Sequence, residues 1–201
     1  MHEGKIWQAL GEFDKQSFSK YVFGLIDSVP AYIYLLCAFL SLLSVIILFT
    51  WKRFENRIKV ATWLMLLGYV LIILCSTTIF RAYSESKPIE LKPFWSYDSV
   101  LGGNTYLLYE NIMNVLMFFP IGFLLGCLFS LSKWWATLLI GISLSVSIEL
   151  LQLGFHRGLC ELDDLIHNTT GCLIGLLIAM VVKAFFCFSK SRINSCCQVQ
   201  Q

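Results

Sequence analysis

Three short stretches of polar residues stand beside long apolar ones, and their side chains could bind a polar ligand or move a proton. Carboxylates and amides hydrogen-bond hydroxyl and amine groups, and an arginine can hold a phosphate or carboxylate through two parallel hydrogen bonds. A histidine beside a carboxylate can act in acid–base catalysis. The candidate ligand-binding residues are Asn111, Asn114, Glu149, Gln152, Arg157, Asp163, Asp164 and Asn168, and the candidate catalytic residues are Glu149, Asp164 and His156.

The composition of the chain places this chemistry in a membrane. Of its 201 residues, 57% are hydrophobic and 14% are charged, whereas a soluble domain carries roughly 25% charged residues because water must solvate its surface. A formal net charge of +2 gives no reason to expect nucleic acid as a partner. These values exclude a soluble enzyme domain, a secreted disulfide scaffold and a nucleic-acid binder, and they predict a polytopic membrane protein.

Five apolar stretches are long enough to cross a bilayer as helices, since about 20 residues span its hydrocarbon core. They are residues 31–50, 60–80, 112–131, 134–153 and 165–182. We therefore expect an all-α fold, a transmembrane helical bundle of about five spans with an amphipathic N-terminal segment. The expected organisation is this segment at 1–30, two spans within 31–80, three spans within 90–188 and a tail at 189–201.

The N-terminal segment repeats apolar residues at helical spacing. They are Ile6, Trp7, Leu10 and Phe13, followed by Phe18, Tyr21, Val22, Leu25 and Ile26. This pattern predicts an amphipathic helix, with a break near residues 27–30 where Pro30 stands. Two placements fit the pattern: a helix lying on the membrane surface, or an extension of the first span packed against the bundle.

The distribution of Lys and Arg predicts which ends of the spans face the cytoplasm. With the three lysines of the N-terminal tail left out, eight flank one side, namely Lys52, Arg53, Arg57, Lys59, Lys133, Lys183, Lys190 and Arg192, and four flank the other, namely Arg81, Lys87, Lys92 and Arg157. Cytoplasmic loops carry the excess of basic residues. We therefore expect a multi-pass protein of the cell membrane whose C-terminus is cytoplasmic and whose three polar stretches lie at the outer face.

Helical geometry brings the polar residues of each stretch onto one face. At about 100° per residue, Glu149, Gln152 and His156 fall on one stripe if their helix continues that far. Asp164 and Asn168 share a stripe of the last span. The three polar stripes are expected to converge on one outward-facing cavity.

Glycines extend this pattern along the spans. Gly171 and Gly175 continue the stripe of the last span, and Gly122 and Gly126 repeat the spacing on the third. Small residues four positions apart let another helix approach closely. The polar stripe of the last span is therefore expected to face the bundle and not the lipid.

The residues alone leave three roles open. The cluster could bind a ligand, or it could belong to an enzyme in which Glu149 or Asp164 is the general base and His156 is the acid partner or a metal ligand. Alternatively it could be a structural network in which Arg157 pairs with Asp163 or Asp164. No spacing fixes the mutual distances of these groups, so we expect neither a metal nor a cofactor.

At these residues the chain resembles the VanZ-like family of integral membrane proteins. The resemblance covers residues 90–178 and rests on Asn111-Ile-Met-Asn114-Val-Leu-Met-Phe-Phe-Pro120-Ile-Gly122, on Ser147-Ile-Glu149-Leu-Leu-Gln152, and on Arg157 followed by Asp163-Asp164-Leu-Ile-His-Asn168-Thr-Thr-Gly171. The preceding Leu91-Lys-Pro-Phe94 also fits the family.

The resemblance implies a bacterial protein of the cell envelope, associated with low-level resistance to the glycopeptide teicoplanin. Its partners would be membrane lipids and a lipid-linked cell-wall precursor or lipid headgroup held at the outer face. Binding of that component would reduce the access of glycopeptides to their target. The enzymatic alternative is hydrolysis or transfer of such a headgroup.

Overall fold

The computed structural model describes residues 15–50, 54–85 and 89–198, with side chains described for all of these except residues 54–56 and 187–198. Within these ranges the chain is helical apart from two strands of two residues each. In chain order the elements are α2 (Lys15–Asp27), α3 (Ala31–Thr50), α4 (Phe54–Leu74), the π-helix η1 (Cys75–Ile79), β1 (Ile89–Glu90), α5 (Trp95–Leu101), α6 (Tyr106–Leu128), the 3-10 helix η2 (Leu131–Lys133), α7 (Trp134–Phe155), β2 (Cys160–Glu161) and α8 (Leu162–Gln198).

Among the described residues, five helical segments have the length and composition to span a membrane, which confirms the predicted number. They are Ala31–Thr50, Arg57–Ile79, Tyr106–Leu128, Leu131–Phe155 and Leu162–Phe186. The last three begin earlier than predicted, and the third also ends before its predicted limit. Polar residues taken as boundaries, such as Glu110 and Asp163, lie inside α6 and α8. Large apolar side chains such as Leu35 and Phe49 are exposed, as expected of surfaces that contact lipid.

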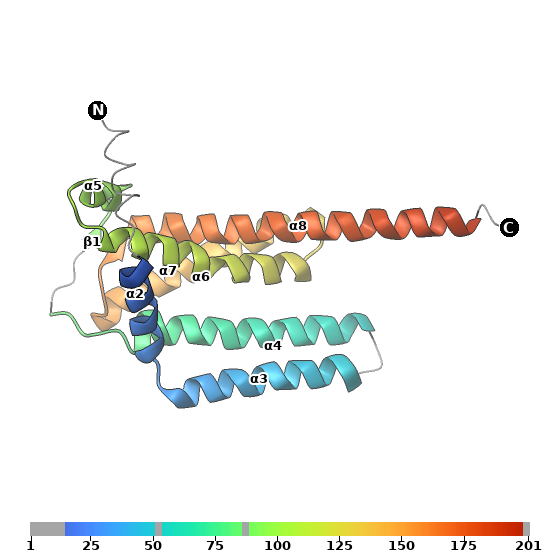
Figure 1. Cartoon of the computed structure of the whole chain (residues 1–201), viewed down its shortest axis with the longest axis horizontal. Coiled ribbons are helices and arrows are strands. Elements are labelled where there is room, and N and C mark those ends of the chain that lie inside the picture. The colour runs from blue at the N-terminus through green and yellow to red at the C-terminus, as the bar shows by residue number, and fades with distance from the viewer. Residues whose placement is uncertain (1–14, 51–53, 86–88, 199–201) are drawn as a thin grey trace.

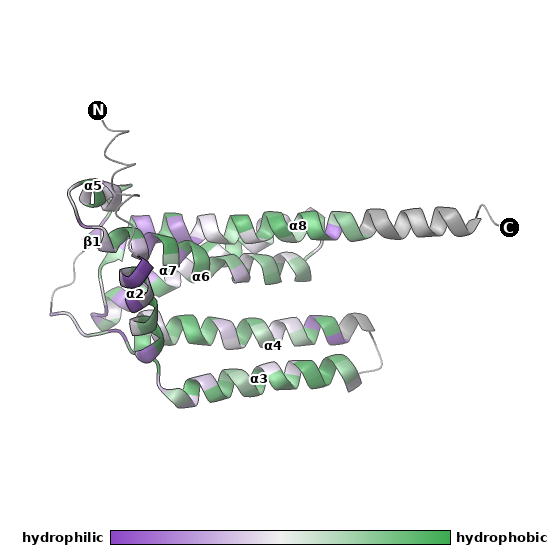
Figure 2. Ribbon diagram, viewed as in Figure 1, coloured by the Kyte–Doolittle hydropathy of each residue, from purple (hydrophilic) through white to green (hydrophobic). Residues whose placement is uncertain are grey.

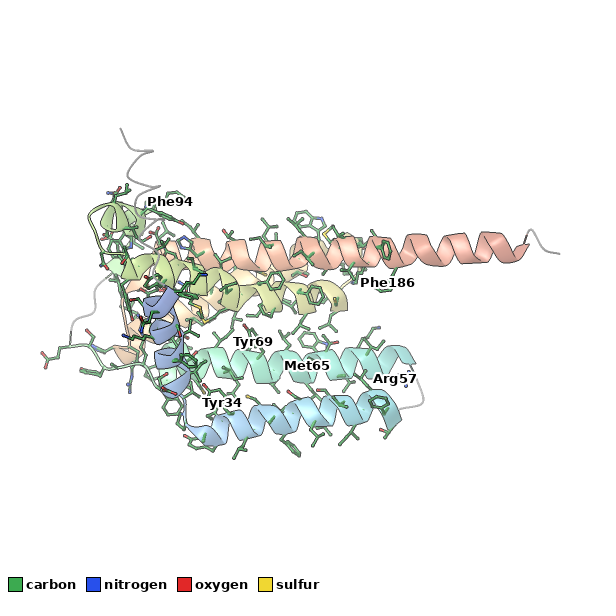
Figure 3. All side chains as sticks on the ribbon, in the orientation of Figure 1. Tyr34, Arg57, Met65, Tyr69, Phe94 and Phe186 are labelled. Atoms are coloured by element: carbon green, nitrogen blue, oxygen red, sulfur yellow. The ribbon has the colours of Figure 1, made fainter. Side chains whose placement is uncertain are left out.

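The three C-terminal spans form one group, and the first two form a hairpin beside it (Figure 1). α6 and α8 run side by side in the same direction, and α7 returns antiparallel in contact with both. α4 connects the hairpin to this group: Tyr69 lies on the side of α4 that faces α6 (Figure 3), and its hydroxyl donates to the carbonyl of Met117 at 3.0 Å. The core between these helices consists of Leu66, Ile73, Phe118, Ile121, Leu125, Ile148 and Cys172.

α6 and α8 approach each other closely because glycines occupy their contact. An added Cβ at Gly171 would overlap the backbone carbonyl of Val115, and one at Gly122 would overlap that of Cys172. Gly175 meets the backbone of α6 in the same way. The structure thus confirms that the small-residue pattern of the last span faces another helix.

The N-terminal segment forms a helix of its own, α2, which ends at Asp27 before the predicted break. Its aromatic side chains pack on the start of α6, with the ring of Phe18 5.7 Å from that of Tyr109 and the ring of Tyr21 4.9 Å from that of Tyr106. α2 is therefore packed against the bundle without being a continuation of α3. The helical pattern predicted for residues 6–13 lies outside the described residues.

Polar residues are concentrated at one end of the bundle, where α2, the start of α6, the end of α7 and the start of α8 meet (Figure 2). β1 and β2 pair in parallel here, with Ile89 opposite Cys160 and Glu90 opposite Glu161. The pairing ties the segment before α5 to the segment between α7 and α8. The convergence of the polar stretches at one end is therefore a property of the fold.

The glycine contact between α6 and α8 can be tested with a matched pair of variants. Gly171→Ala is expected to lower the free energy of unfolding by about 1–3 kcal/mol, because the added methyl group overpacks the contact. Gly154→Ala is the control, since a Cβ there meets nothing within 4 Å; it should be neutral or stabilise α7 by up to about 1 kcal/mol. Thermal unfolding of both proteins in one detergent checks this, and equal melting temperatures would contradict the close contact.

Candidate functional site

Asp163, the first of two adjacent aspartates in α8, anchors the loop before α5. It is fully buried and accepts hydrogen bonds from the backbone N–H of Phe94, from the backbone N–H of Ser96 at 3.0 Å and from the hydroxyl of Ser96 at 2.6 Å. Phe94, at the start of α5 (Figure 3), has a φ of 61°, which is uncommon for a residue with a side chain. Asn111 of α6 extends this network by donating to the Ser96 hydroxyl at 3.0 Å.

Asp164, the second aspartate, faces α6 instead. Its carboxylate accepts a hydrogen bond of 2.7 Å from the side-chain amide of Asn114. One turn further along α8, the amide of Asn168 donates to the hydroxyl of Ser145 in α7 at 2.9 Å. The polar face of α8 therefore connects α6 and α7 at the level where the glycine contact begins.

Two polar residues near the end of α7 are also buried. Glu149 accepts a hydrogen bond of 2.9 Å from the backbone N–H of Glu161 in β2. Gln152 donates to the carbonyl of Thr77 at 3.1 Å. Thr77 belongs to the π-helix η1, so this bond joins α7 to the end of the second span.

An ion pair links the end of the second span to the third span. Arg81, just after η1, lies 3.0 Å from the carboxylate of Glu110 in α6. Arg157 donates to the backbone carbonyl of Arg81, and among the described residues it forms no ion pair with a carboxylate. The structural hypothesis that paired Arg157 with Asp163 or Asp164 was wrong, because the turn after α7 directs the guanidinium toward the Arg81 backbone.

A cavity of about 660 Å³ lies at this end of the bundle. Its polar lining consists of Ser17, Lys20, Tyr21, Ser28, Ser76, Thr77, Arg81, Tyr106, Glu110, Asn114, Glu149, Gln152, Asp164 and Asn168. Its apolar lining consists of Gly24, Leu25, Ile73, Phe80, Ala82, Met117, Phe118 and Ile148. The cavity is thus built by α2, the end of the second span and all three C-terminal spans, and it has both a polar and an apolar wall.

Two buried acceptors of the lining have no hydrogen-bond partner among the described residues. They are the amide oxygens Oε1 of Gln152 and Oδ1 of Asn168, in side chains of residues that are 2% and 3% exposed. A buried polar atom without a partner destabilises the protein by about 1–3 kcal/mol. Both residues belong to the lining of the cavity.

The structure brings together five of the sequence-predicted ligand-binding residues in the cavity wall: Asn114, Glu149, Gln152, Asp164 and Asn168. It places the other three, Asn111, Asp163 and Arg157, in hydrogen bonds behind the wall. These three residues are not part of the described cavity lining, and their role in binding stays a prediction.

His156 is separated from the candidate carboxylates because α7 ends before it. The helix stops at Phe155, and His156 takes a φ of 55°, which turns its side chain off the stripe of Glu149 and Gln152. Its ring stacks on Tyr83 at 5.4 Å, and it is absent from the described lining of the cavity. Within the described part of the chain, no three His, Cys, Asp or Glu side chains are grouped so that they could hold a metal ion.

The candidate ligand-binding residues did not include three residues of the lining, Arg81, Glu110 and Tyr21, although Glu110 belongs to the polar stripe predicted for the third span. Arg81 was counted only as a loop charge, although its place directly after a span was a usable signal. Glu110 stands four residues before Asn114 and shares its helix face. Tyr21 could not have been found, because nothing in the periodicity of α2 says which surface the helix covers.

Glu161 is the acidic residue of β2, and its backbone N–H is the donor to Glu149. Its carboxylate accepts a hydrogen bond of 3.0 Å from the indole N–H of Trp95. Burial, supported by the charges of Asp164 and Glu110, raises the pKa of Glu161 to about 8. The Glu161 side chain is therefore largely neutral at pH 7, and its backbone N–H remains the donor to Glu149.

The comparisons with known proteins are consistent with the motifs. A family model described as VanZ/LLP1 matches residues 31–183, which is more than half of the chain and includes the first two spans. No curated protein and no solved structure matches the chain significantly.

The two adjacent aspartates should respond differently to the same substitution. Asp163→Asn is expected to destabilise the protein by about 1–3 kcal/mol for each donor left without a good acceptor, because Asp163 holds three donors of the α5 segment. Asp164→Asn keeps an acceptor for Asn114 and should change stability less. Membrane abundance and melting temperature of the two variants check this, and a greater loss for Asp164→Asn would refute the assignment.

The raised pKa of Glu161 predicts a pH dependence of stability. An acid whose pKa is higher in the folded than in the unfolded state stabilises the fold below the unfolded value, and that contribution is lost as the pH rises through the folded value. The melting temperature is thus expected to fall between about pH 5 and pH 9. Glu161→Gln should flatten this decrease, whereas the exposed control Glu85→Gln should keep the wild-type slope. Identical slopes in all three proteins would rule out a contribution from Glu161.

Proposed function

The chain belongs to the VanZ/LLP1 family, and we propose that its cavity binds the polar headgroup of a cell-envelope component. The observation that carries this proposal is the cavity of about 660 Å³ whose wall contains Glu149, Asp164 and two unpartnered amide oxygens. A volume of this size accepts an organic group and lies in the usual range of ligand pockets. The ligand classes that fit are a lipid headgroup and a lipid-linked cell-wall precursor.

The two kinds of wall support an amphipathic ligand. Carboxylates and amides of α6, α7 and α8 can contact hydroxyl or amine groups of a headgroup. Leu25, Met117, Phe118 and Ile148 can contact the apolar atoms that follow it. A lipid in the surrounding bilayer offers this combination, because its headgroup and first acyl carbons are joined at the membrane interface.

The structural-network hypothesis explains only part of the cluster. It fits Asp163 and Asn111, whose recorded bonds all serve the α5 segment. It gives no reason for the unpartnered acceptors of Gln152 and Asn168, since a network that serves stability alone gains from satisfying every buried group. These acceptors favour a ligand.

The enzymatic alternative has weaker support from the geometry. Glu149 and Asp164 line one cavity, so a carboxylate pair is available for acid–base work. The acid partner proposed from the sequence, His156, is stacked on Tyr83 outside the described lining. Headgroup binding requires only side chains that line the cavity, such as Glu149 and Asp164.

The proposed role in the cell follows from the orientation that the basic residues predict. With the C-terminus in the cytoplasm, the cavity faces outward, where glycopeptides act. Retention of an envelope component there would reduce the access of teicoplanin to its target.

Drug susceptibility provides the test of this function. In a sensitive Gram-positive host, the wild-type protein is expected to protect against teicoplanin, whereas Glu149→Gln and Asp164→Asn should reduce protection to the level of the host alone. The exposed control Glu85→Gln should protect as the wild type does. Membrane abundance is measured in the same cells, so that loss of protein is distinguished from loss of the site.

Arg157→Ala separates direct from indirect roles in the same assay. Arg157 contacts the Arg81 carbonyl and does not line the cavity. If the Arg157→Ala variant loses protection, its abundance in the membrane should therefore fall as well. Abundant wild-type protein without any protection would contradict the resistance role and leave only the membrane fold.

A further inference from the structure

We infer that the headgroup recognised by the cavity carries a primary ammonium. This inference rests on the proposed function and specifies the chemistry of its ligand. It starts from the surplus of hydrogen-bond acceptors among the buried groups of the wall.

Four side chains in the buried part of the cavity can accept further hydrogen bonds. Gln152 Oε1 and Asn168 Oδ1 have no partner among the described residues. Glu149 and Asp164 each have one recorded hydrogen bond, to one carboxylate oxygen. A ligand atom that reaches this part therefore needs to donate several hydrogen bonds, and an ammonium has three N–H donors.

Three hydroxyl donors of this wall are already engaged elsewhere. Ser76 and Thr77 both donate to the carbonyl of Ile73, at 3.1 and 2.8 Å. Ser28 donates to the carbonyl of Leu25 at 2.7 Å. These hydroxyls do not supply the missing donors, and the requirement passes to the ligand.

The charges of the lining indicate a single positive charge on the ligand. Two basic side chains, Lys20 and Arg81, and three acidic ones, Glu110, Glu149 and Asp164, line the cavity. Arg81 is paired with Glu110, and Lys20 is exposed on α2. With Lys20 counted, the lining has one more acidic than basic side chain. A buried carboxylate is stabilised by a cation in contact with it, so one ammonium beside Glu149 or Asp164 would bring the formal charge of the lining to zero.

The same observations disfavour three other ligand classes. A sugar hydroxyl donates but brings no charge, and an anion would meet Glu149 and Asp164. A bare divalent ion needs six or more closely placed oxygens, and among the described residues no three His, Cys, Asp or Glu side chains are grouped so that they could hold one. A trimethylammonium has the charge but no N–H to satisfy the two amide oxygens.

The experiment measures binding of three lipids with identical acyl chains to the purified full-length protein in a nonionic detergent. Phosphatidylethanolamine carries the primary ammonium, phosphatidylcholine its trimethylated form, and phosphatidylglycerol only hydroxyls. Phosphatidylethanolamine is expected to bind at least about tenfold more tightly than either of the other two lipids. The reason is that those lipids leave buried acceptors of the cavity without a hydrogen-bond donor, which weakens binding by about this factor. Equal binding of the first two lipids, or preference for phosphatidylglycerol, would overturn the inference.

Competitors identify the source of the ammonium. Displacement of the lipid by free phosphoethanolamine would assign the recognition to the headgroup alone. If only the soluble amine binds and no lipid does, the ammonium chemistry stands with a soluble ligand. If micromolar Mg²⁺ or Ca²⁺ displaces the lipid and the soluble amine does not, the cavity is an ion site and the proposal is overturned.

Variants connect the binding to the wall. Glu149→Gln and Gln152→Met should each weaken phosphatidylethanolamine binding about tenfold or more, while Glu85→Gln should bind as the wild type does. The lipid comparison uses the wild-type protein, so a variant that fails to fold leaves it intact. Teicoplanin protection without any amine preference would refute this inference alone, whereas loss of both would refute the proposed function as well.

Discussion

The close approach of α6 and α8 is the contact on which the candidate site depends. Lipid offers no hydrophobic driving force between helices, so spans associate through close backbone packing and hydrogen bonds. Gly122, Gly171 and Gly175 remove the side chains that would separate the two axes. Only at that separation can Asn114 reach Asp164 across the interface at 2.7 Å. The glycines thus position the polar wall one or two helical turns away from them.

Two neighbouring aspartates contact different parts of the fold. Because consecutive helical residues point about 100° apart, Asp163 faces the α5 segment while Asp164 faces the cavity. Asp163 uses its carboxylate on three donors of the chain, and Asp164 has one recorded bond, to Asn114. The structural-network hypothesis therefore fits Asp163, and the ligand-site hypothesis applies to Asp164.

Helical periodicity explains how much of this arrangement could be predicted from the sequence. The number of spans, the glycine contact and the convergence of polar stripes all follow from spacing within continuous helices. The placement of His156 and Arg157 could not be predicted from helical spacing, because they lie past the end of α7, where the positive φ of His156 redirects the chain. The covering position of α2 and the pair of Arg81 with Glu110 depend on contacts between distant segments, which no local pattern encodes. The ligand-binding role of the five cavity residues stays a prediction.

The π-helix at Cys75–Ile79 adds a condition on the register of the second span. A π-helical turn holds about one residue more than an α-helical turn, so deleting a single residue there would rotate everything that follows by about 100°. Arg81 would then turn away from Glu110, and the carbonyl of Thr77 would leave Gln152, with no change in residue type. When related chains are aligned, the length of this segment is therefore as informative about the site as the identity of the arginine after it.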